Sequence, residues 1–384
     1  MKLELTSRDD RYVKIKLPNS MGLPRLKCLI LNLVISFDTS FSKIISSCPV
    51  LETLIARTTH GSGTSDQYIT INSSTLKHLE IKDRGYSTGK LTINTPNLTS
   101  FVCQDHMRNN YCLEELPSLV AADIEMYVEA HFDGDHNVEF PEAYLELSEE
   151  LRVVFAEHLL KFLRALHGVK ELKLSPGFFE IIGLYMDEIN SSIRYDLDLQ
   201  PVTSLPDSYG RCNFTDLPVY WTILHFSSVT EVELWLTRGC LDVISHLLKI
   251  SPNIESIYIT SKECENFNGV WEPVLPQPCM LSHLKFIEIG AVQGYDNQLK
   301  LLGFLLKNAI ALEDVRLYFR FIHCLADQRR RVSEFSKKLK ALPRASSSQE
   351  EYLELFEELC QAYAGISEVL FMNQVEQSRP KKST

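Results

Sequence analysis

A short pattern of apolar residues recurs along the chain and constrains its fold more than any other feature. In each copy apolar residues occupy positions 1, 4 and 6, as do Leu26, Leu29 and Leu31. Copies start at residues 26, 51, 76, 98, 119, 169, 229, 254, 284 and 312. Self-similarity at a spacing of 20 to 30 residues is typical of chains that stack one structural unit on the next. The sequence therefore predicts a repeat architecture.

Proline supports this interpretation. Five prolines lie two residues before position 1 of a copy, although proline accounts for only 16 of the 384 residues: Pro24, Pro49, Pro96, Pro117 and Pro252. Proline ends the preceding segment and has no N–H for a strand ladder, so it fits immediately before a strand. We therefore expect each copy to begin a short strand.

A unit of this length with an L-x-L strand is typical of the leucine-rich repeat. We predict an α/β fold, a leucine-rich-repeat solenoid of the ribonuclease-inhibitor-like horseshoe kind, with a parallel sheet and irregular helices. Because stacked repeats bury one another, Leu29, Leu54, Leu79 and Ile257 should line one continuous spine.

Helical periodicity predicts helices between some of these strands, at residues 41–45, 241–249 and about 149–166. Two gaps interrupt the repeat, from 119 to 169 and from 169 to 229. The second gap contains residues 196–216, which are rich in Pro, Gly, Ser and Asp and predict an exposed insertion.

Several motifs resemble those of plant F-box proteins of the FBD and leucine-rich-repeat type. The "CPVLE" motif of that family is matched by Cys48 to Glu52, and its FBD segment by residues from Leu281 to Glu313. The resemblance covers about residues 1–348, and further motifs that carry it are residues 95–98, 116–123, 337–339 and 342–348.

The resemblance implies a division into three parts. Residues 1–273 form a leucine-rich-repeat solenoid, residues 274–348 an FBD-like region that continues it, and residues 349–384 a C-terminal helix and a disordered basic tail. Leu3 and Leu5 already match the strand of a repeat. We therefore expect the chain to start within a repeat, without an F-box.

Family members act as substrate receptors of SCF-type ubiquitin ligases, in which the F-box docks on a Skp-type adaptor and the repeats select the target. The resemblance thus implies a non-catalytic protein–protein interaction module, similar to the substrate-recognition part of such a receptor. Without an F-box, binding to a Skp-type adaptor is in doubt. The alternative is a stand-alone scaffold or a competitor that binds targets without recruiting a ligase.

Side chains alternate along a strand, so positions 3, 5 and 7 of each repeat should face away from the spine, on the concave face. In the later repeats this face is aromatic and mainly acidic, which suits a peptide with basic residues and an apolar anchor. Our candidate partner-binding residues are Glu231, Glu233, Trp235, Tyr258, Phe286, Glu288, Asp314, Arg316 and Tyr318. Alternatively, helices or insertions cover this face, or its aromatic residues only pack on one another.

Composition narrows the partners and the compartment. Lys and Arg total 39 against 50 Asp and Glu, a formal charge of -11, which disfavours nucleic acid as a partner. No apolar run is long enough to suggest a signal peptide or a membrane span. The ten cysteines are scattered without a C-x-x-C pair, which indicates reduced thiols and a cytoplasmic or nuclear protein.

No motif predicts catalysis, a metal site or a cofactor. Residues 133–137 resemble the start of a calcium loop, but Val138 and Tyr144 replace the Gly and Glu that an EF-hand needs. Residues 60–63 are rich in glycine but lack a nucleophile motif, and we expect a connection there. Basic residues at 329–331, 337–338 and 379–382 are either a nuclear import signal or solvated charge.

Overall fold

The fold is described by a computed structural model of the chain. It describes residues 1–6, 22–32, 39–58, 68–83, 90–106, 110–127, 158–159, 162–175, 226–236, 240–261, 281–319, 334–335, 337–339 and 341–342.

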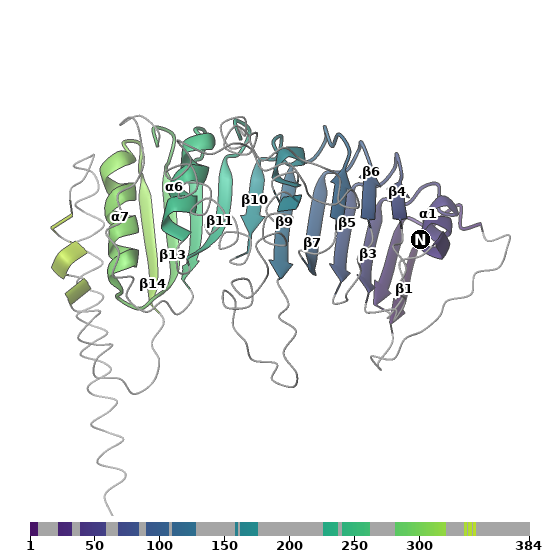
Figure 1. The fold of residues 1–384 in the computed structure, drawn as a ribbon, viewed down its shortest axis with the longest axis horizontal. Coiled ribbons are helices and arrows are strands. Elements are labelled where there is room, and N and C mark those ends of the chain that lie inside the picture. Colours follow the sequence, from purple (N-terminus) through teal and green to yellow (C-terminus); the bar gives the residue numbers. More distant parts are fainter. Residues whose placement is uncertain are drawn as a thin grey trace, which may run out of the picture.

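One parallel sheet of eleven strands runs the length of the described part of the molecule (Figure 1). Its strands follow one another in chain order: β1 (Lys2–Thr6), β2 (Cys28–Asn32), β3 (Thr53–Thr58), β5 (His78–Asp83), β7 (Ser100–His106), β9 (Ala121–Tyr127), β10 (Glu171–Leu174), β11 (Glu231–Leu236), β12 (Ser256–Ser261), β13 (Phe286–Val292) and β14 (Asp314–Phe319). Each repeat contributes one strand, as the periodicity predicts. The fold is a leucine-rich-repeat solenoid of the α/β class.

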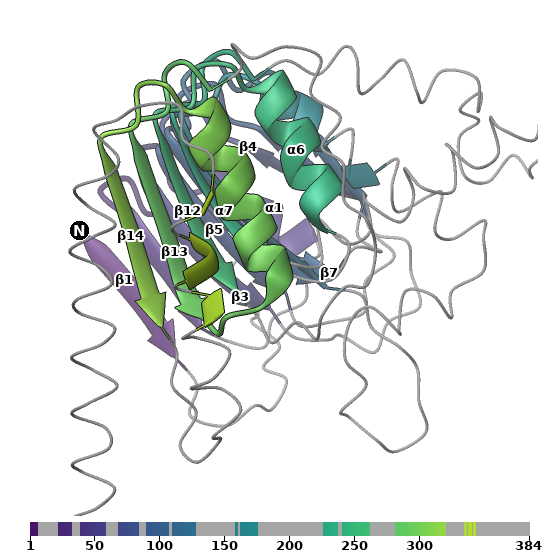
Figure 2. The ribbon, with the colours of Figure 1, turned by 90° about the vertical axis from the view of Figure 1, so that its left-hand side faces the viewer.

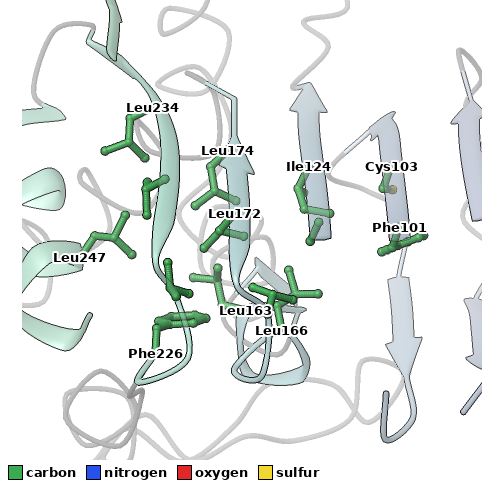
Figure 3. Close-up of a cluster of buried hydrophobic side chains, with 14 of the residues drawn as sticks. Phe101, Cys103, Ile124, Leu163, Leu166, Leu172, Leu174, Phe226, Leu234 and Leu247 are labelled. Atoms are coloured by element: carbon green, nitrogen blue, oxygen red, sulfur yellow. The ribbon is translucent and has the colours of Figure 1, made fainter. Parts of the chain in front are cut away.

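The register of the strands builds the predicted spine. Position 4 of each repeat pairs with position 4 of the next, so that Leu29 lies beside Leu54 and Leu54 beside Leu79. The row continues to Ile257, and all four side chains are at most 1% exposed. Each buried aliphatic side chain of this kind contributes about 1.5–3 kcal/mol. Figure 3 shows the middle of this core, where residues of β7, β9, β10 and β11 pack together.

The turn before each strand explains the prolines. The N–H of position 1 donates to the carbonyl three residues earlier, as from Leu51 to Cys48 (3.1 Å) and from Leu98 to Thr95 (3.0 Å). Pro49 and Pro96 therefore occupy the second position of a four-residue turn, where the fixed φ of proline is favoured. The expectation that a strand follows each proline is confirmed, and the physical reason is turn geometry as much as the missing N–H.

Two kinds of element cover the back of the sheet, the side that carries the spine. Three are helices: α1 (Thr39–Ser46), α6 (Cys240–Ile250) and α7 (Asp296–Asn308). The others are strands β4 (Tyr68–Asn72), β6 (Lys90–Asn94) and β8 (Asn110–Leu113), which form a second parallel sheet. Figure 2 shows α6 and α7 together on one side of the main sheet.

The helices predicted at 41–45 and 241–249 are confirmed by α1 and α6. Of the helix predicted over 149–166, only residues 158–159 and 162–165 are described, and they are helical. The second sheet was not predicted. Its signal is the alternation in Tyr68–Asn72 and Lys90–Asn94, where Ile71 and Ile93 are fully buried.

Several predictions fall on residues outside the described part: the loops at 60–63 and 133–137, the insertion at 196–216, the basic run at 329–331 and everything from 349 to 384. Strands β13 and β14 lie in the predicted FBD-like region and continue the main sheet. The domain boundaries themselves stay predictions. Among the described helices, none combines the length and apolar character that a membrane crossing requires.

Candidate protein-binding face

We call the side of the main sheet opposite the spine the open face. It carries positions 3 and 5 of each repeat, and these side chains are partly or fully exposed while positions 4 and 6 are mostly buried. The described helices α6 and α7 lie on the other side of the sheet (Figure 2). The alternation predicted from the sequence therefore places the candidate residues with described side chains on one surface.

An aromatic and cationic cluster occupies the open face over β12, β13 and β14. The ring centroids of Tyr258 and Phe286 are 5.3 Å apart. The guanidinium carbon of Arg316 lies 4.9 Å from the centroid of the Phe286 ring, a cation–π contact. Asp314 accepts a hydrogen bond from Nε of Arg316 at 3.0 Å and forms a 2.9 Å ion pair with it. Four predicted residues are thus joined in one contiguous cluster.

The surroundings of this cluster shift two of its pKa values. Hydrogen bonding to Asp314, together with the charge of that carboxylate, raises the pKa of Arg316. Partial burial raises the pKa of Tyr258, and the charges of Glu231 and Glu288 add to this effect. Both groups therefore keep their protons throughout the physiological range. The cluster presents a cation and a neutral phenol to a partner.

The open face over β9, β10 and β11 is acidic. Lys173 forms an ion pair with Glu233 at 3.1 Å and lies 3.9 Å from Asp123. Burial raises the pKa of Asp123, and the nearby charges of Glu233 and Glu125 outweigh too little of the Lys173 attraction to leave it low. Burial also raises the pKa of Glu231, with further contributions from Glu171 and Glu233. Negative charge is therefore crowded in this region.

The open face of the early repeats is different in character. His78 contacts the hydroxyl of Ser100 at 3.1 Å, and Lys82 forms a 2.8 Å ion pair with Glu80. Aliphatic and small neutral side chains separate these polar contacts, as at Ile30. This part has no described counterpart of the aromatic cluster.

The remaining candidates are placed as follows. Glu288 lies in register between Tyr258 and Arg316, and Tyr318 is 53% exposed at the end of the row. The backbone of Trp235 pairs with Thr260 of β12, but its side chain lies outside the described part. Their role in binding stays a prediction. The aromatic residues do pack on one another, which the sequence left open as an alternative.

Sequence reasoning left Lys173 out of the candidate set. Its position 5 in the repeat that starts at 169 already puts it on the open face, so the signal was available. What the sequence did not show is that Lys173 neutralises Glu233. Within the described ranges, no group of three or more His, Cys, Asp or Glu side chains is arranged to hold a metal ion.

Two protein families match the chain. The family described as "FBD-associated F-box protein At5g56370, LRR repeats" matches residues 5–123, and the FBD family matches residues 272–317. The second match includes β13 and ends within β14.

Relatives from Arabidopsis thaliana match most of the chain. A putative FBD-associated F-box protein is 24% identical over 360 residues, which cover 90% of this chain and 67% of the relative. An F-box/FBD/LRR-repeat protein is 25% identical over 332 residues, covering 85% and 62% respectively. A putative F-box/LRR-repeat protein is 34% identical over 130 residues, covering 32% and 30%.

The chain thus spans about three fifths to two thirds of the first two relatives. No solved structure matches it. The agreement of two family matches, in the expected order, with a sheet that adds one strand per repeat leads to one conclusion. The repeats and the FBD segment of this chain are those of the plant F-box/FBD/leucine-rich-repeat proteins.

Proposed function

We propose that this protein is a non-catalytic interaction module that recognises a target protein through its open face, as the substrate-recognition part of an F-box-type ubiquitin ligase receptor. The family matches support a protein-interaction role. The names of the relatives, which include the F-box, support the ligase context.

The observation that carries this proposal is the cluster of Tyr258, Phe286 and Arg316. Tyr and Arg are enriched among the residues that dominate binding energy at protein interfaces. Here they are held in place by their neighbours before any partner binds: Phe286 lies against both, and Asp314 orients the guanidinium. Preorganisation of this kind lowers the entropy that association costs.

The proposal is tested by comparing partners captured by the full chain and by single variants. Tyr258→Ala, and likewise Trp235→Ala, should reduce capture of a specific target by about tenfold or more, as truncation of an interface anchor does. Lys285→Ala is the matched control, because Lys285 lies at the edge of the sheet and pairs there with Glu255 at 2.9 Å. Unchanged capture by both open-face variants would contradict the proposal.

The second candidate function is a stand-alone scaffold that binds targets without delivering them to a ligase. Co-expression of the chain with a Skp-type adaptor separates the two. Co-elution as a stable complex supports the receptor. Failure to co-elute, together with target levels that do not change when the protein is depleted, supports the scaffold.

We also propose residence in the cytosol or the nucleus, where thiols stay reduced. Cys28, Cys48, Cys103 and Cys112 are free thiols in the structure. Imaging of a fluorescent fusion of the full chain checks this proposal, and entry into the secretory pathway would contradict it.

A further inference from the structure

Position 3 of the later repeats forms a straight row across the open face. The strand register places Glu171 of β10 beside Glu231 of β11, and Glu231 beside Ser256 of β12. Ser256 in turn lies beside Phe286 of β13. The row therefore reads carboxylate, carboxylate, small hydroxyl, aromatic ring. We call these four residues the position-3 row.

The two carboxylates of this row are the unneutralised acids of the region. Glu233, in the neighbouring row, pairs with Lys173, and Asp314 pairs with Arg316. Among the described residues, neither Glu171 nor Glu231 forms an ion pair. Two adjacent carboxylates without a counter-ion repel each other, in line with the raised pKa of Glu231, which has burial as its main cause and Glu171 next. A cation from outside would relieve this repulsion.

The row also has a relief that suits an extended chain. Ser256 is small, so it leaves space between Glu231 and the ring of Phe286. Phe286 is partly exposed and backed by Tyr258 and Arg316, which fix its position. The ring can accept one apolar side chain at a defined distance from the carboxylates.

That distance follows from strand geometry. Neighbouring strands are about 4.8 Å apart, so the midpoint of Glu171 and Glu231 lies about 12 Å from Phe286. An extended peptide advances about 3.3 Å per residue, and its side chains point alternately to opposite sides. Residues that face the same way are separated by an even number. Four residues span about 13 Å, whereas two span about 7 Å, the distance to Ser256.

We propose that the position-3 row binds an extended basic segment of the target protein that crosses the strands, with a Lys or Arg on Glu171 and Glu231 and an apolar side chain four residues away on Phe286. The residue midway between them faces Ser256. This rests on the proposed function and adds to it the class of partner and the spacing that it must carry. Charge complementarity selects a basic protein segment and disfavours nucleic acid, whose phosphates would meet the carboxylates.

The test uses the full chain and labelled ten-residue peptides in an Ala/Ser background. Each peptide holds one arginine and one leucine, two to six positions apart, in both chain directions. Fluorescence anisotropy should give the tightest binding at a separation of four, about tenfold tighter than at three or five, because an odd separation turns one side chain away from the sheet. Equal affinity at all separations would overturn the proposal.

Paired variants locate the site. Glu171→Gln combined with Glu231→Gln keeps the side-chain shape and should weaken the four-spaced peptide about tenfold or more. Glu114→Gln combined with Glu115→Gln removes the same charge from exposed residues in the connection between β8 and β9, and should leave binding unchanged. Equal loss in both pairs would show general electrostatic attraction only and would contradict the site.

The apolar half is tested separately. Phe286→Ala should abolish the preference for a separation of four while keeping residual binding of the arginine. A peptide with lysine in place of arginine should bind, and the same peptide with acetyllysine should bind about as weakly as an alanine peptide, since acetylation removes the charge. Retained binding of the acetylated peptide would count against the carboxylate contact.

The two proposals fail in different ways. If no peptide shows a spacing preference but Tyr258→Ala still loses a captured target, the extended-segment proposal is wrong and the target-recognition proposal stands. If Tyr258→Ala, Trp235→Ala and the glutamine pair all leave capture and peptide binding unchanged, both are wrong.

Discussion

The repeats between β3 and β9 differ from those between β11 and β14 in the element that covers the back of the sheet. The former are backed by β4, β6 and β8, and the latter by α6 and α7. The repeats that start at 76 and 98 are 22 and 21 residues long, whereas those that start at 254 and 284 are 30 and 28. Repeat length and backing element change together.

The physical reason is the rise per residue. The five residues of β6 span about 16 Å at 3.3 Å per residue. The eleven residues of α6 span about the same length at 1.5 Å per residue. A helix therefore needs about six more residues than a strand to cover the same depth of sheet, which is close to the difference in repeat length.

Buried polar contacts also differ between the two regions. In the strand-backed region the hydroxyl of Tyr111 in β8 donates to Asp105 in β7, and this pair joins the two sheets. In the helix-backed region Gln298 of α7 donates to Ser261 of β12 at 2.7 Å. Each region thus has its own link between the main sheet and its backing, so the two should respond to mutation separately.

The largest expected effect is in the strand-backed core. Phe101 is fully buried, and its ring centroid lies 5.9 Å from that of Phe162. Phe101→Ala should lower the free energy of unfolding by about 3–5 kcal/mol, measured by chemical denaturation, because it leaves a cavity. Phe101→Leu should cost less.

Hydrogen exchange on Phe101→Ala sharpens the comparison. Repeats contact mainly their neighbours, so protection should fall in β5, β7 and β9 and persist in β12, β13 and β14. An equal loss of protection in all strands would show one cooperative unit and contradict a division into two regions.

The next effect concerns Gln298 in the helix-backed region. Its Oε1 accepts the backbone N–H groups of Gln293, Gly294 and Tyr295 at 3.0–3.1 Å, and its side chain is buried. Gln298→Ala leaves these donors without that acceptor and should cost about 3 kcal/mol in the free energy of unfolding.

Two variants provide the reference for Gln298→Ala. Ser261→Ala removes a single hydrogen bond and should cost about 1 kcal/mol. Tyr111→Phe removes the corresponding link of the other region, where Asp105 has further interactions, and should also cost about 1–2 kcal/mol. A cost for Gln298→Ala no larger than these would argue against its role as a shared acceptor.

A smaller effect is expected from pH on the open face. The pKa of Glu231 is raised in the free protein, and a bound cation favours its ionised form. Binding of the four-spaced peptide should therefore be strongest above this raised pKa and weaken as pH falls through it. Peptide titrations by anisotropy between neutral pH and about pH 4 measure this.

The variant Glu231→Gln should lack this step in the pH dependence and retain only the part due to Glu171. An identical pH profile in the variant and in the parent chain would show that Glu231 does not contact the cation.

The smallest effect is expected at the exposed edge of the sheet, where the two regions should behave alike. Glu52 pairs with Lys27 at 2.7 Å and with Lys77 at 3.3 Å, and Glu255 pairs with Lys285 at 2.9 Å. Hydrogen bonds to these lysines lower the pKa of both carboxyl groups. Glu52→Gln and Glu255→Gln should each leave the denaturation midpoint nearly unchanged at physiological salt, because exposed pairs are screened. A marked shift in one region only would reveal a further difference between them.

Much of the fold was predictable because burial leaves a periodic trace. Position 1, 4 and 6 residues such as Leu76, Leu79 and Ile81 must be apolar to stack, and the prolines mark the turns between units. The second sheet was missed because β4 and β6 are short alternating runs between stronger signals. Ile71 and Ile93, which repeat the same alternation 22 residues apart, were the available clue.

The candidate face was predictable in outline only. Alternation along each strand placed Tyr258, Phe286 and Arg316 on one side. Their contacts, and the ion pair of Lys173 with Glu233, depend on residues 26 to 60 positions apart in the chain. Local periodicity carries no information on which charges will be neutralised.

The sequence by itself determined the repeat, the inward spine and the outward alternation, because each of these is set by the burial of residues close together in the chain. Only the tertiary structure decided which back is strand and which is helix, and which side chains meet across neighbouring strands. Those outcomes depend on strand register and on the depth of sheet that each connection must cover. Both are properties of the stacked units and not of one repeat alone.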